Sequence, residues 1–346
     1  MKKPKDKTPL KSALIVNPNW NKTIGELKKK RVLFISEPVE GKTNISLPPD
    51  DGKKIQILEK DSISHDLNAH NGKDVALSYQ LEAYDESYYK YAALSGAAYF
   101  TCHTLVRLDS DDYVSMCELT ANYITRSEEV VGDSEVFSLA SADSSTGAKF
   151  NENYSEERKN FLKTNVSDNT ILIIDGPLIG NQLSSRTIRL VKDLKERNVA
   201  TFFVTKNSDS MLLSNEIAPK KYHSDLDWAS KNLPSGHRSS FIKYKDLNAG
   251  HTEIFCYLKT YAYASPLRIS FYPTIYNENK DLVKEVMDML YFLILDDGNQ
   301  NNPQVRLIRI AELFAKDIIK IANPDRQVRM SGLIPTVNQS RFGRSL

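Results

Sequence analysis

Four consecutive aliphatic residues, Ile171-Leu172-Ile173-Ile174, are followed by Asp175 and then by Gly176-Pro177. Three of the four are β-branched, which predicts a short strand buried on both faces. Gly-Pro cannot continue the ladder, so the strand ends on an acid. A carboxylate there lies at the carboxyl edge of the sheet, where open α/β sheets bind ligands. Asp175 alternatively caps the following turn or helix, and the segment alone leaves both roles open.

Upstream of this strand, residues 74–84 alternate between apolar and other side chains, which predicts a strand with one apolar face. Asp85 continues the apolar register. Because burying an unpaired carboxylate costs free energy, an acid at a buried strand position is expected to have a binding partner. The alternative is that Asp85 has already left the sheet and lies in a turn. Further strands rich in Tyr, Phe, Thr and Val are predicted at residues 97–106 and 113–125.

A helix is predicted at residues 151–163, with Tyr154, Phe161 and Leu162 on its buried side. Glu157 lies three residues after Tyr154 and four before Phe161, so it projects on or beside that side. A solvated helical glutamate is the alternative. After Asp175 the pattern predicts a second helix at 185–197 and a buried strand at 199–204. Lys206 stands two residues beyond that strand.

Three strands, a helix, the strand ending at Asp175, a helix and a fifth strand form the order of a ribonuclease H-like α/β fold, a mixed sheet flanked by helices. In that fold the first and fourth strands are parallel neighbours, so Asp85, Glu157 and Asp175 would converge at one edge. Three carboxylates repel one another unless a cation holds them, and hard oxygen ligands select Mg²⁺ or Mn²⁺. Such a cluster suits phosphodiester hydrolysis.

Shorter strands are predicted on both sides of this core, and two long helices near the C-terminus. The strands fall at residues 31–35, 54–58, 241–244, 253–263 and 267–272, and the helices at 281–295 and 305–321. The aromatic side chains of residues 239–275 either stack unpaired bases or are buried in the sheet.

Composition is that of a globular protein, with 40% hydrophobic and 26% charged residues among 346. The longest apolar run, residues 289–295, is too short to cross a bilayer, and no signal-peptide h-region follows the N-terminus. The three cysteines (Cys102, Cys117, Cys256) form neither a disulfide framework nor a zinc pattern. We therefore expect a cytoplasmic protein.

Charge is unevenly distributed along the chain. Residues 1–31 contain ten Lys and Arg against two acidic residues, a net charge of +8, and the far end carries four further arginines after residue 325. Basic ends on a nearly neutral body indicate contact with a polyanion, and solvated tails are the alternative. We divide the chain into a basic arm (1–31), an N-terminal elaboration (32–74), a nuclease-like domain (75–325) and a basic tail (326–346).

The ordered motifs of residues 75–322 resemble those of the NurA family of nucleases. Asp85-Glu86-Ser87, followed by Ser95-Gly96, is similar to the family's first Asp-Gly-Ser motif, and residues 173–178 to its second acidic motif. Lys206 matches the family's lysine, and Glu157 has a spacing similar to that of its helical glutamate. Residues 303–312 are similar to a last motif ending in Ala-His. Two departures are Glu86 in place of Gly and Glu312 in place of His. Residues 1–70 have no counterpart in the family that we can place.

This resemblance implies a DNA nuclease in which Asp85, Glu157 and Asp175 bind Mn²⁺ or Mg²⁺, Lys206 contacts a phosphate, and Glu312 is a possible extra ligand. It also implies a homodimer that works on DNA with a HerA-type hexameric ATPase, in repair or in phage defence. One alternative is a NurA-like subunit with an impaired site, which serves the ring as a DNA clamp or adaptor. Another is a ribonuclease H-like enzyme acting on RNA or a hybrid.

Overall fold

The computed structural model describes residues 23–24, 27–29, 55–109, 112–141, 145–179, 184–218, 220–246 and 250–336. The chain divides into two compact units, residues 1–37 and 38–346. In the first unit the described residues are helical, and most of the predicted basic arm lies outside the described residues. So do the predicted strand at 31–35 and the end of the predicted tail, residues 337–346.

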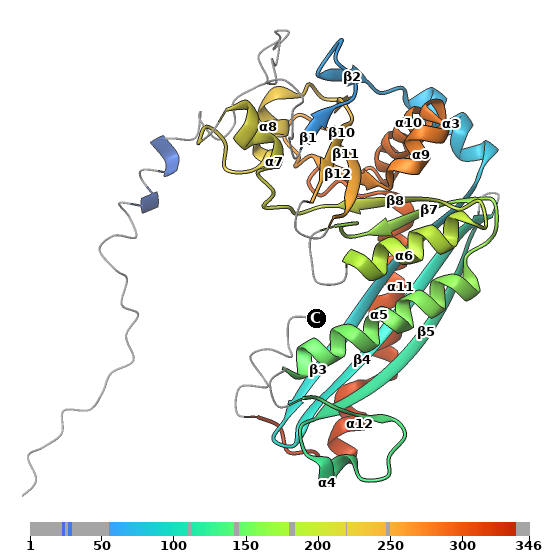
Figure 1. Cartoon of the computed structure of the whole chain (residues 1–346), viewed down its shortest axis with the longest axis vertical. Coiled ribbons are helices and arrows are strands. Elements are labelled where there is room, and N and C mark those ends of the chain that lie inside the picture. The colour runs from blue at the N-terminus through green and yellow to red at the C-terminus, as the bar shows by residue number, and fades with distance from the viewer. Residues whose placement is uncertain are drawn as a thin grey trace, which may run out of the picture. The chain divides into compact units, whose positions relative to one another are not determined.

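One mixed sheet of twelve strands organises the described part of the second unit (Figure 1). The strands along its main path follow the order β1-β10-β11-β12-β8-β7-β3-β4-β5-β6, and β2 and β9 join beside β11. Their bounds are β1 (Ile55–Ile57), β2 (Ser64–Asp66), β3 (Gln80–Ala93), β4 (Gly96–Asp109), β5 (Asp112–Thr125), β6 (Phe137–Leu139), β7 (Thr170–Asp175), β8 (Ala200–Thr205), β9 (His237–Ser239), β10 (Ile242–Lys245), β11 (Thr252–Lys259) and β12 (Leu267–Phe271).

The central five strands have the predicted ribonuclease H-like arrangement. β3, β4 and β5 form an antiparallel meander, and β7 runs parallel to both β3 and β8. The first and fourth strands of this core are therefore parallel neighbours, which confirms the predicted fold class. Residues 55–66 of the predicted N-terminal elaboration add β1 and β2 to the same sheet.

Helices cover both faces of the central strands. The helices described in the second unit are α3 (Ala69–Ser78), α4 (Glu128–Val131), α5 (Thr146–Asn165), α6 (Ser184–Lys195), α7 (Leu212–Ile217), α8 (Asp225–Asn232), α9 (Pro273–Glu278), α10 (Lys280–Asp297), α11 (Arg306–Ala322) and α12 (Pro324–Met330). In Figure 1, α5 and α6 lie in front of the long strands and α11 lies behind them. None of the described helices is long and apolar enough to span a membrane.

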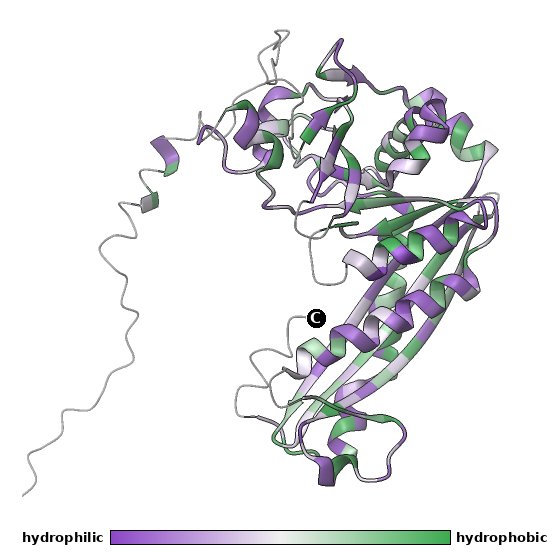
Figure 2. Ribbon diagram, in the orientation of Figure 1, coloured by the Kyte–Doolittle hydropathy of each residue, from purple (hydrophilic) through white to green (hydrophobic). Residues whose placement is uncertain are grey.

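The alternation of side chains decides which core each strand residue joins. Tyr84 and Ile174 pack with the inner side of α5 and α6, whereas Ala83 and Ile173 pack with α10 and the start of α11. Figure 2 shows the matching pattern, with hydrophilic colour on the outer side of α5 and hydrophobic colour on β7 and β8. Where the pairing of β3 with β7 ends, one face of β3 therefore packs against α5 and α6, and the other packs against α10 and α11.

Two secondary-structure predictions were wrong in part. The strand predicted at residues 253–263 ends at Lys259. Residues 75–78, predicted as the start of the first strand, form the last turn of α3, and β3 begins only at Gln80. Asn68 caps α3 by accepting from the backbone N–H groups of His70 and Asn71 at 3.0 and 3.1 Å. Gly72 lets α3 approach α10, because a Cβ there would lie 2.1 Å from the carbonyl oxygen of Asp288. Tertiary packing on α10 thus selects helix over the period-2 pattern.

Candidate active site

An open pocket of about 620 Å³ lies where β7 ends beside β3. It is lined from β3, the segment after β7, the end of β8, the start of β12, the α10–α11 connection and α11. The lining residues are Asp85, Glu86, Asp175, Gly176, Pro177, Thr205, Lys206, Asn207, Ser265, Leu267, Asn301, Asn302, Pro303, Gln304 and Glu312. Four of the five residues that the sequence singled out, Asp85, Asp175, Lys206 and Glu312, are therefore brought together.

Asp175 is the last residue of β7, as predicted. Its neighbour Gly176 has φ +103°, a backbone conformation that favours glycine, and its N–H still donates to Val204 at 2.9 Å. The chain thus turns away while Asp175 remains at the sheet edge. Burial raises the pKa of the Asp175 carboxyl, and the Lys206 ammonium 2.8 Å away offsets this only in part.

Asp85 lies within β3 and not in a turn. The last β3–β7 pair joins Tyr84 to Ile174, so Asp85 is the next residue along the parallel ladder beside Asp175. It is 7% exposed. Burial, together with the negative charges of Asp175 and Glu86, raises the pKa of Asp85 to about 8. In the metal-free protein the pocket therefore holds an acid that keeps its proton near neutral pH.

Lys206 follows β8 directly and joins two acids. Its ammonium contacts Asp175 at 2.8 Å and Glu312 at 3.3 Å. Burial would lower the pKa of Lys206, but the two carboxylates outweigh it and hold the pKa above its ordinary value. Lys206 thus remains charged, with its positive end inside the pocket.

Glu312, on α11, accepts from two lysines. Its second contact is with Lys316, one helical turn away at 2.6 Å. Burial alone would raise the pKa of Glu312, but Lys316 and Lys206 together hold it below its ordinary value. Both oxygens of Glu312 therefore contact ammonium groups. Glu312 would have to give up at least one of these contacts to bind a metal ion, as the family motif implies.

Glu157 does not line the pocket. From α5 its two oxygens accept from Thr120 at 2.9 Å and Asn122 at 2.8 Å, and His103 lies 3.5 Å away. Burial raises the pKa of Glu157, but the nearby His103 and the hydrogen bonds from Asn122 and Thr120 outweigh this and lower it overall. The structure thus places Glu157 against β4 and β5, apart from the pocket-lining residues.

Glu86 lines the pocket, although sequence reasoning treated it only as a departure from the family pattern. The Tyr154 hydroxyl donates to its Oε1, and its Oε2 is buried without a hydrogen-bond partner. Its backbone N–H donates to Asp85 Oδ1 at 2.8 Å. An acid beside a predicted site aspartate was the signal available in the sequence.

Four amide side chains, from Asn207, Asn301, Asn302 and Gln304, also line the pocket and were not predicted. The last three lie in the polar run between α10 and α11, whose composition alone indicates a loop. Gln304 is 8% exposed. Amides supply both donors and acceptors, so this wall can form hydrogen bonds with sugar, base or phosphate groups.

The donor set of the pocket suits a hard divalent cation. Within the described residues, no group of three His, Cys, Asp or Glu side chains is already arranged to hold a metal. The neighbouring carboxyl groups of Asp85 and Asp175, with the unpartnered oxygen of Glu86, are nevertheless the ligand type that Mg²⁺ and Mn²⁺ prefer.

The central strand order and the acidic pocket at its edge define a ribonuclease H-like α/β protein. The family model of the NurA domain matches residues 143–318, and the chain belongs to the NurA family of nucleases. The match covers α5, β7, β8 and most of α11. None of the curated proteins matches this chain.

One solved structure agrees with this assignment at the level of fold. The NurA nuclease from Sulfolobus solfataricus is 11% identical, covers 91% of this chain and 98% of its own, and superposes with a TM-score of 0.51. Weaker matches include a second NurA crystal structure (6% identity, 87% and 94% coverage, TM-score 0.38). Endonuclease V of Bacillus subtilis matches at 12% identity, with coverage of 71% and 83% and a TM-score of 0.40.

Proposed function

We propose that this chain is a divalent-metal-dependent deoxyribonuclease that processes DNA ends. The observation that carries the proposal is the pair formed by the buried Asp85 and the partly buried Asp175, which are adjacent across β3 and β7 and line an open pocket with Lys206. Two acids held together at a sheet edge raise each other's proton affinity, and a cation removes that penalty. Membership in a nuclease family supports the same conclusion.

In this proposal Asp85 and Asp175 hold Mn²⁺ or Mg²⁺. The family resemblance also implies Glu157 as a ligand, but its two oxygens accept from Thr120 and Asn122, and it does not line the pocket. When bound, such a cation activates water and stabilises the leaving oxygen of a phosphodiester. Lys206 contributes a fixed positive charge that contacts the phosphate. Pairing with Asp175 and Glu312 orients its ammonium before substrate binds.

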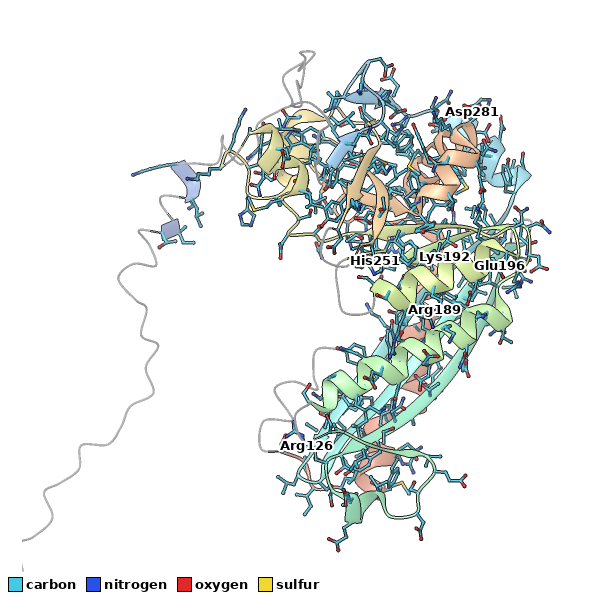
Figure 3. All side chains as sticks on the ribbon, viewed as in Figure 1. Arg126, Arg189, Lys192, Glu196, His251 and Asp281 are labelled. Atoms are coloured by element: carbon cyan, nitrogen blue, oxygen red, sulfur yellow. The ribbon has the colours of Figure 1, made fainter. Side chains whose placement is uncertain are left out.

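The first test compares Asp175→Asn with Asp281→Asn, a matched control because Asp281 is exposed on α10 (Figure 3). Labelled linear DNA is incubated with each protein and Mn²⁺ or Mg²⁺, and both cleavage and DNA binding are measured. We expect Asp175→Asn to lose cleavage while retaining binding and folding, and the control to behave as wild type. Undiminished cleavage by Asp175→Asn would refute the proposal.

The second test separates the two lysines that contact Glu312. Lys206→Met should reduce cleavage by about 100-fold, since it removes a positioned charge from the reacting phosphate. Lys316→Met, which removes the other contact of Glu312, should leave cleavage within about threefold of wild type. Equal losses in both variants would show that Lys206 acts only through Glu312.

We also propose, from the family resemblance, a homodimer that works with a HerA-type hexameric ATPase in DNA repair or phage defence. Sedimentation of the full chain, alone and with a candidate ring, tests both associations. A chain that remains monomeric and does not co-sediment with the ring would contradict them.

A second candidate function is a DNA clamp or adaptor on such a ring, with an impaired catalytic site. The engagement of Glu312 by two lysines, where the family has a histidine, favours it. Wild type and Asp175→Asn would then be equally inactive with every divalent metal, alone and with a ring, yet would bind DNA normally.

A further inference from the structure

We infer that Glu86, and not Glu157, supplies the third carboxylate of the proposed cation site. This inference rests on the proposed function. It concerns which side chain of this chain completes the Asp85–Asp175 pair, and it identifies a position where the family pattern has glycine.

Glu157 is already satisfied by its neighbours. Two neutral donors, Thr120 and Asn122, occupy its oxygens at 2.9 and 2.8 Å, and the buried His103 lies 3.5 Å away. Asn122 is itself held by Asn153 of α5 at 3.2 Å. To reach the pocket, Glu157 would have to leave these part-buried donors, and both hydrogen bonds would be lost.

Glu86, in contrast to Glu157, has a carboxyl oxygen without a hydrogen-bond donor. It lines the same pocket as Asp85 and Asp175, and its Oε2 is buried without a partner. A buried carboxylate oxygen without a donor is costly, and native structures rarely leave one unless a ligand or ion completes it. The Tyr154 hydroxyl holds only Oε1, so it fixes the carboxyl group near the pocket without satisfying it.

Strand geometry explains how neighbouring residues serve one site. Asp85 and Glu86 project to opposite faces of β3, because successive strand residues alternate. This alternation would separate them inside a sheet. However, β7 pairs with β3 only up to Tyr84, so the edge of β3 is open at both residues. Both residues line the pocket, so rotation of their side chains at this open edge would bring carboxyl groups from either face to one cation.

The charges around Glu86 favour the binding of a cation there. Glu86, Asp85 and Asp175 line the same pocket, so three carboxyl groups adjoin one another there. Lys206 directs its ammonium to Asp175 and Glu312. The buried Arg158 lies over the Tyr84 ring, 5.3 Å from its centroid, and also places a positive charge near Glu86, from outside the pocket lining. Four carboxyl groups, counting Glu312, thus line the pocket with one ammonium group.

Direct measurement of Mn²⁺ binding tests the inference without relying on activity. Isothermal titration of the full chain is carried out for wild type, Glu86→Gln, Glu157→Gln, Asp175→Asn and Glu196→Gln. Glu86→Gln keeps an acceptor for Tyr154 and removes only the charge. Glu196 is an exposed glutamate at the end of α6 (Figure 3), which makes Glu196→Gln the matched control. DNA cleavage and melting temperature in EDTA are measured in parallel.

We expect Glu86→Gln and Asp175→Asn to weaken Mn²⁺ binding by about tenfold or more, because the number of charged ligands tunes the affinity of hard-cation sites. Glu157→Gln and Glu196→Gln should bind within about threefold of wild type. Destabilisation of Glu86→Gln would show as a lower melting temperature in EDTA than that of Glu196→Gln. In that case Glu86→Ala is used instead, and the rise in its melting temperature on adding Mn²⁺ is compared with the rise in Glu157→Gln. That rise should be largely abolished in Glu86→Ala and retained in Glu157→Gln.

Wild-type affinity in folded Glu86→Gln, or an undiminished Mn²⁺-induced rise in Glu86→Ala, overturns the inference. So does a loss of affinity in Glu157→Gln that exceeds the loss in Glu86→Gln. If these results come from a wild-type protein that binds Mn²⁺ and cleaves DNA, the proposed function remains. A wild-type protein that neither binds a divalent cation nor cleaves DNA refutes the proposed function itself.

Discussion

At the residue scale, Asp85 holds its carboxyl group beside that of Asp175 and away from bulk water. Two features place it there. Its register follows the apolar face of β3, and β7 ends on Asp175 one step beyond the last shared pair. Nearest neighbours in the parallel ladder are thus acids from positions ninety residues apart, and each makes the ionisation of the other less favourable.

A pH experiment follows from the pKa of Asp85. Its folded-state pKa, about 8, lies above the ordinary value of 3.8, so the folded protein binds this proton more tightly than the unfolded chain does. Stability from this group is therefore present at low pH and is lost as the pH rises toward 8. Asp85→Asn removes the titration. Its stability relative to wild type should increase by about 4 kcal/mol between about pH 5 and about pH 8.

Denaturant unfolding in EDTA at several pH values measures this difference. Comparing the two proteins at each pH cancels the titration of every other group that is unchanged between them. Asp281→Asn provides the control and should follow wild type throughout. A stability difference that is constant across the range would contradict the shifted pKa of Asp85.

Sequence reasoning reached residues whose position depends on strand register and missed those that depend on packing. Asp175 and Asp85 were found because alternation and strand ends are local properties of the sequence. The surroundings of Glu157 depend on Thr120 and Asn122, which only the docking of α5 on β5 brings near. Glu86 was overlooked as a ligand because its access to the pocket depends on where the pairing of β7 with β3 ends. The sequence of β3 alone does not show that point.

At the element scale, α7 and α8 show how a buried acid organises short helices. Asp225, the first residue of α8, is fully buried and accepts from the backbone N–H groups of Leu213 and Ser214 at the start of α7. It also accepts from Ser210 at 2.9 Å and Tyr257 at 3.0 Å. Met211, the cap residue of α7, offers no side-chain acceptor, so the carboxylate from the neighbouring helix replaces it.

Asp225→Ala should therefore lower the free energy of unfolding by about 3 kcal/mol or more, since four donors are left without a charged acceptor. Asp227→Ala is the control in the same helix, where the half-buried Asp227 pairs with Lys231 and accepts from His223. It should lower the free energy of unfolding by about 1 kcal/mol at most. Denaturant unfolding measures both values, and equal losses would contradict this role of Asp225.

The same scale explains the helix that sequence reasoning mistook for a strand. Val75 fits an alternating pattern, but Asn68 caps a helix and Asp288 of α10 anchors it by accepting from Asn68 N–H at 2.9 Å and the Asn71 amide at 2.8 Å. The alternating pattern does not reveal this anchor, because Asp288 lies more than two hundred positions away in the sequence.

At the scale of the whole molecule, charge is concentrated in the N-terminal residues, which lie largely outside the described part of the chain. The net charge of +8 on residues 1–31 predicts a contact with DNA or an acidic partner. Deleting these residues should weaken DNA binding. The slope of log affinity against log salt concentration should become shallower by about 0.9 for each phosphate that the arm neutralises in the wild-type complex.

Titration of labelled duplex DNA at several salt concentrations measures the slope. A full-length variant with five lysines replaced by glutamine is the matched control for chain length, at Lys2, Lys3, Lys5, Lys7 and Lys11. Its slope should fall between those of wild type and the deletion. Identical affinities and slopes in all three proteins would show that the arm does not contact DNA.

The pocket draws its residues from distant parts of the sequence, which has a consequence for synthesis on the ribosome. β3, β4 and β5 pair as consecutive antiparallel neighbours and require only local contacts, so they can form early. Lys206 meets Glu312 across 106 positions. A nascent chain therefore lacks the pocket wall from α11 until nearly all of the domain has been made. The emerging polypeptide therefore completes this pocket only when synthesis of the domain is nearly finished.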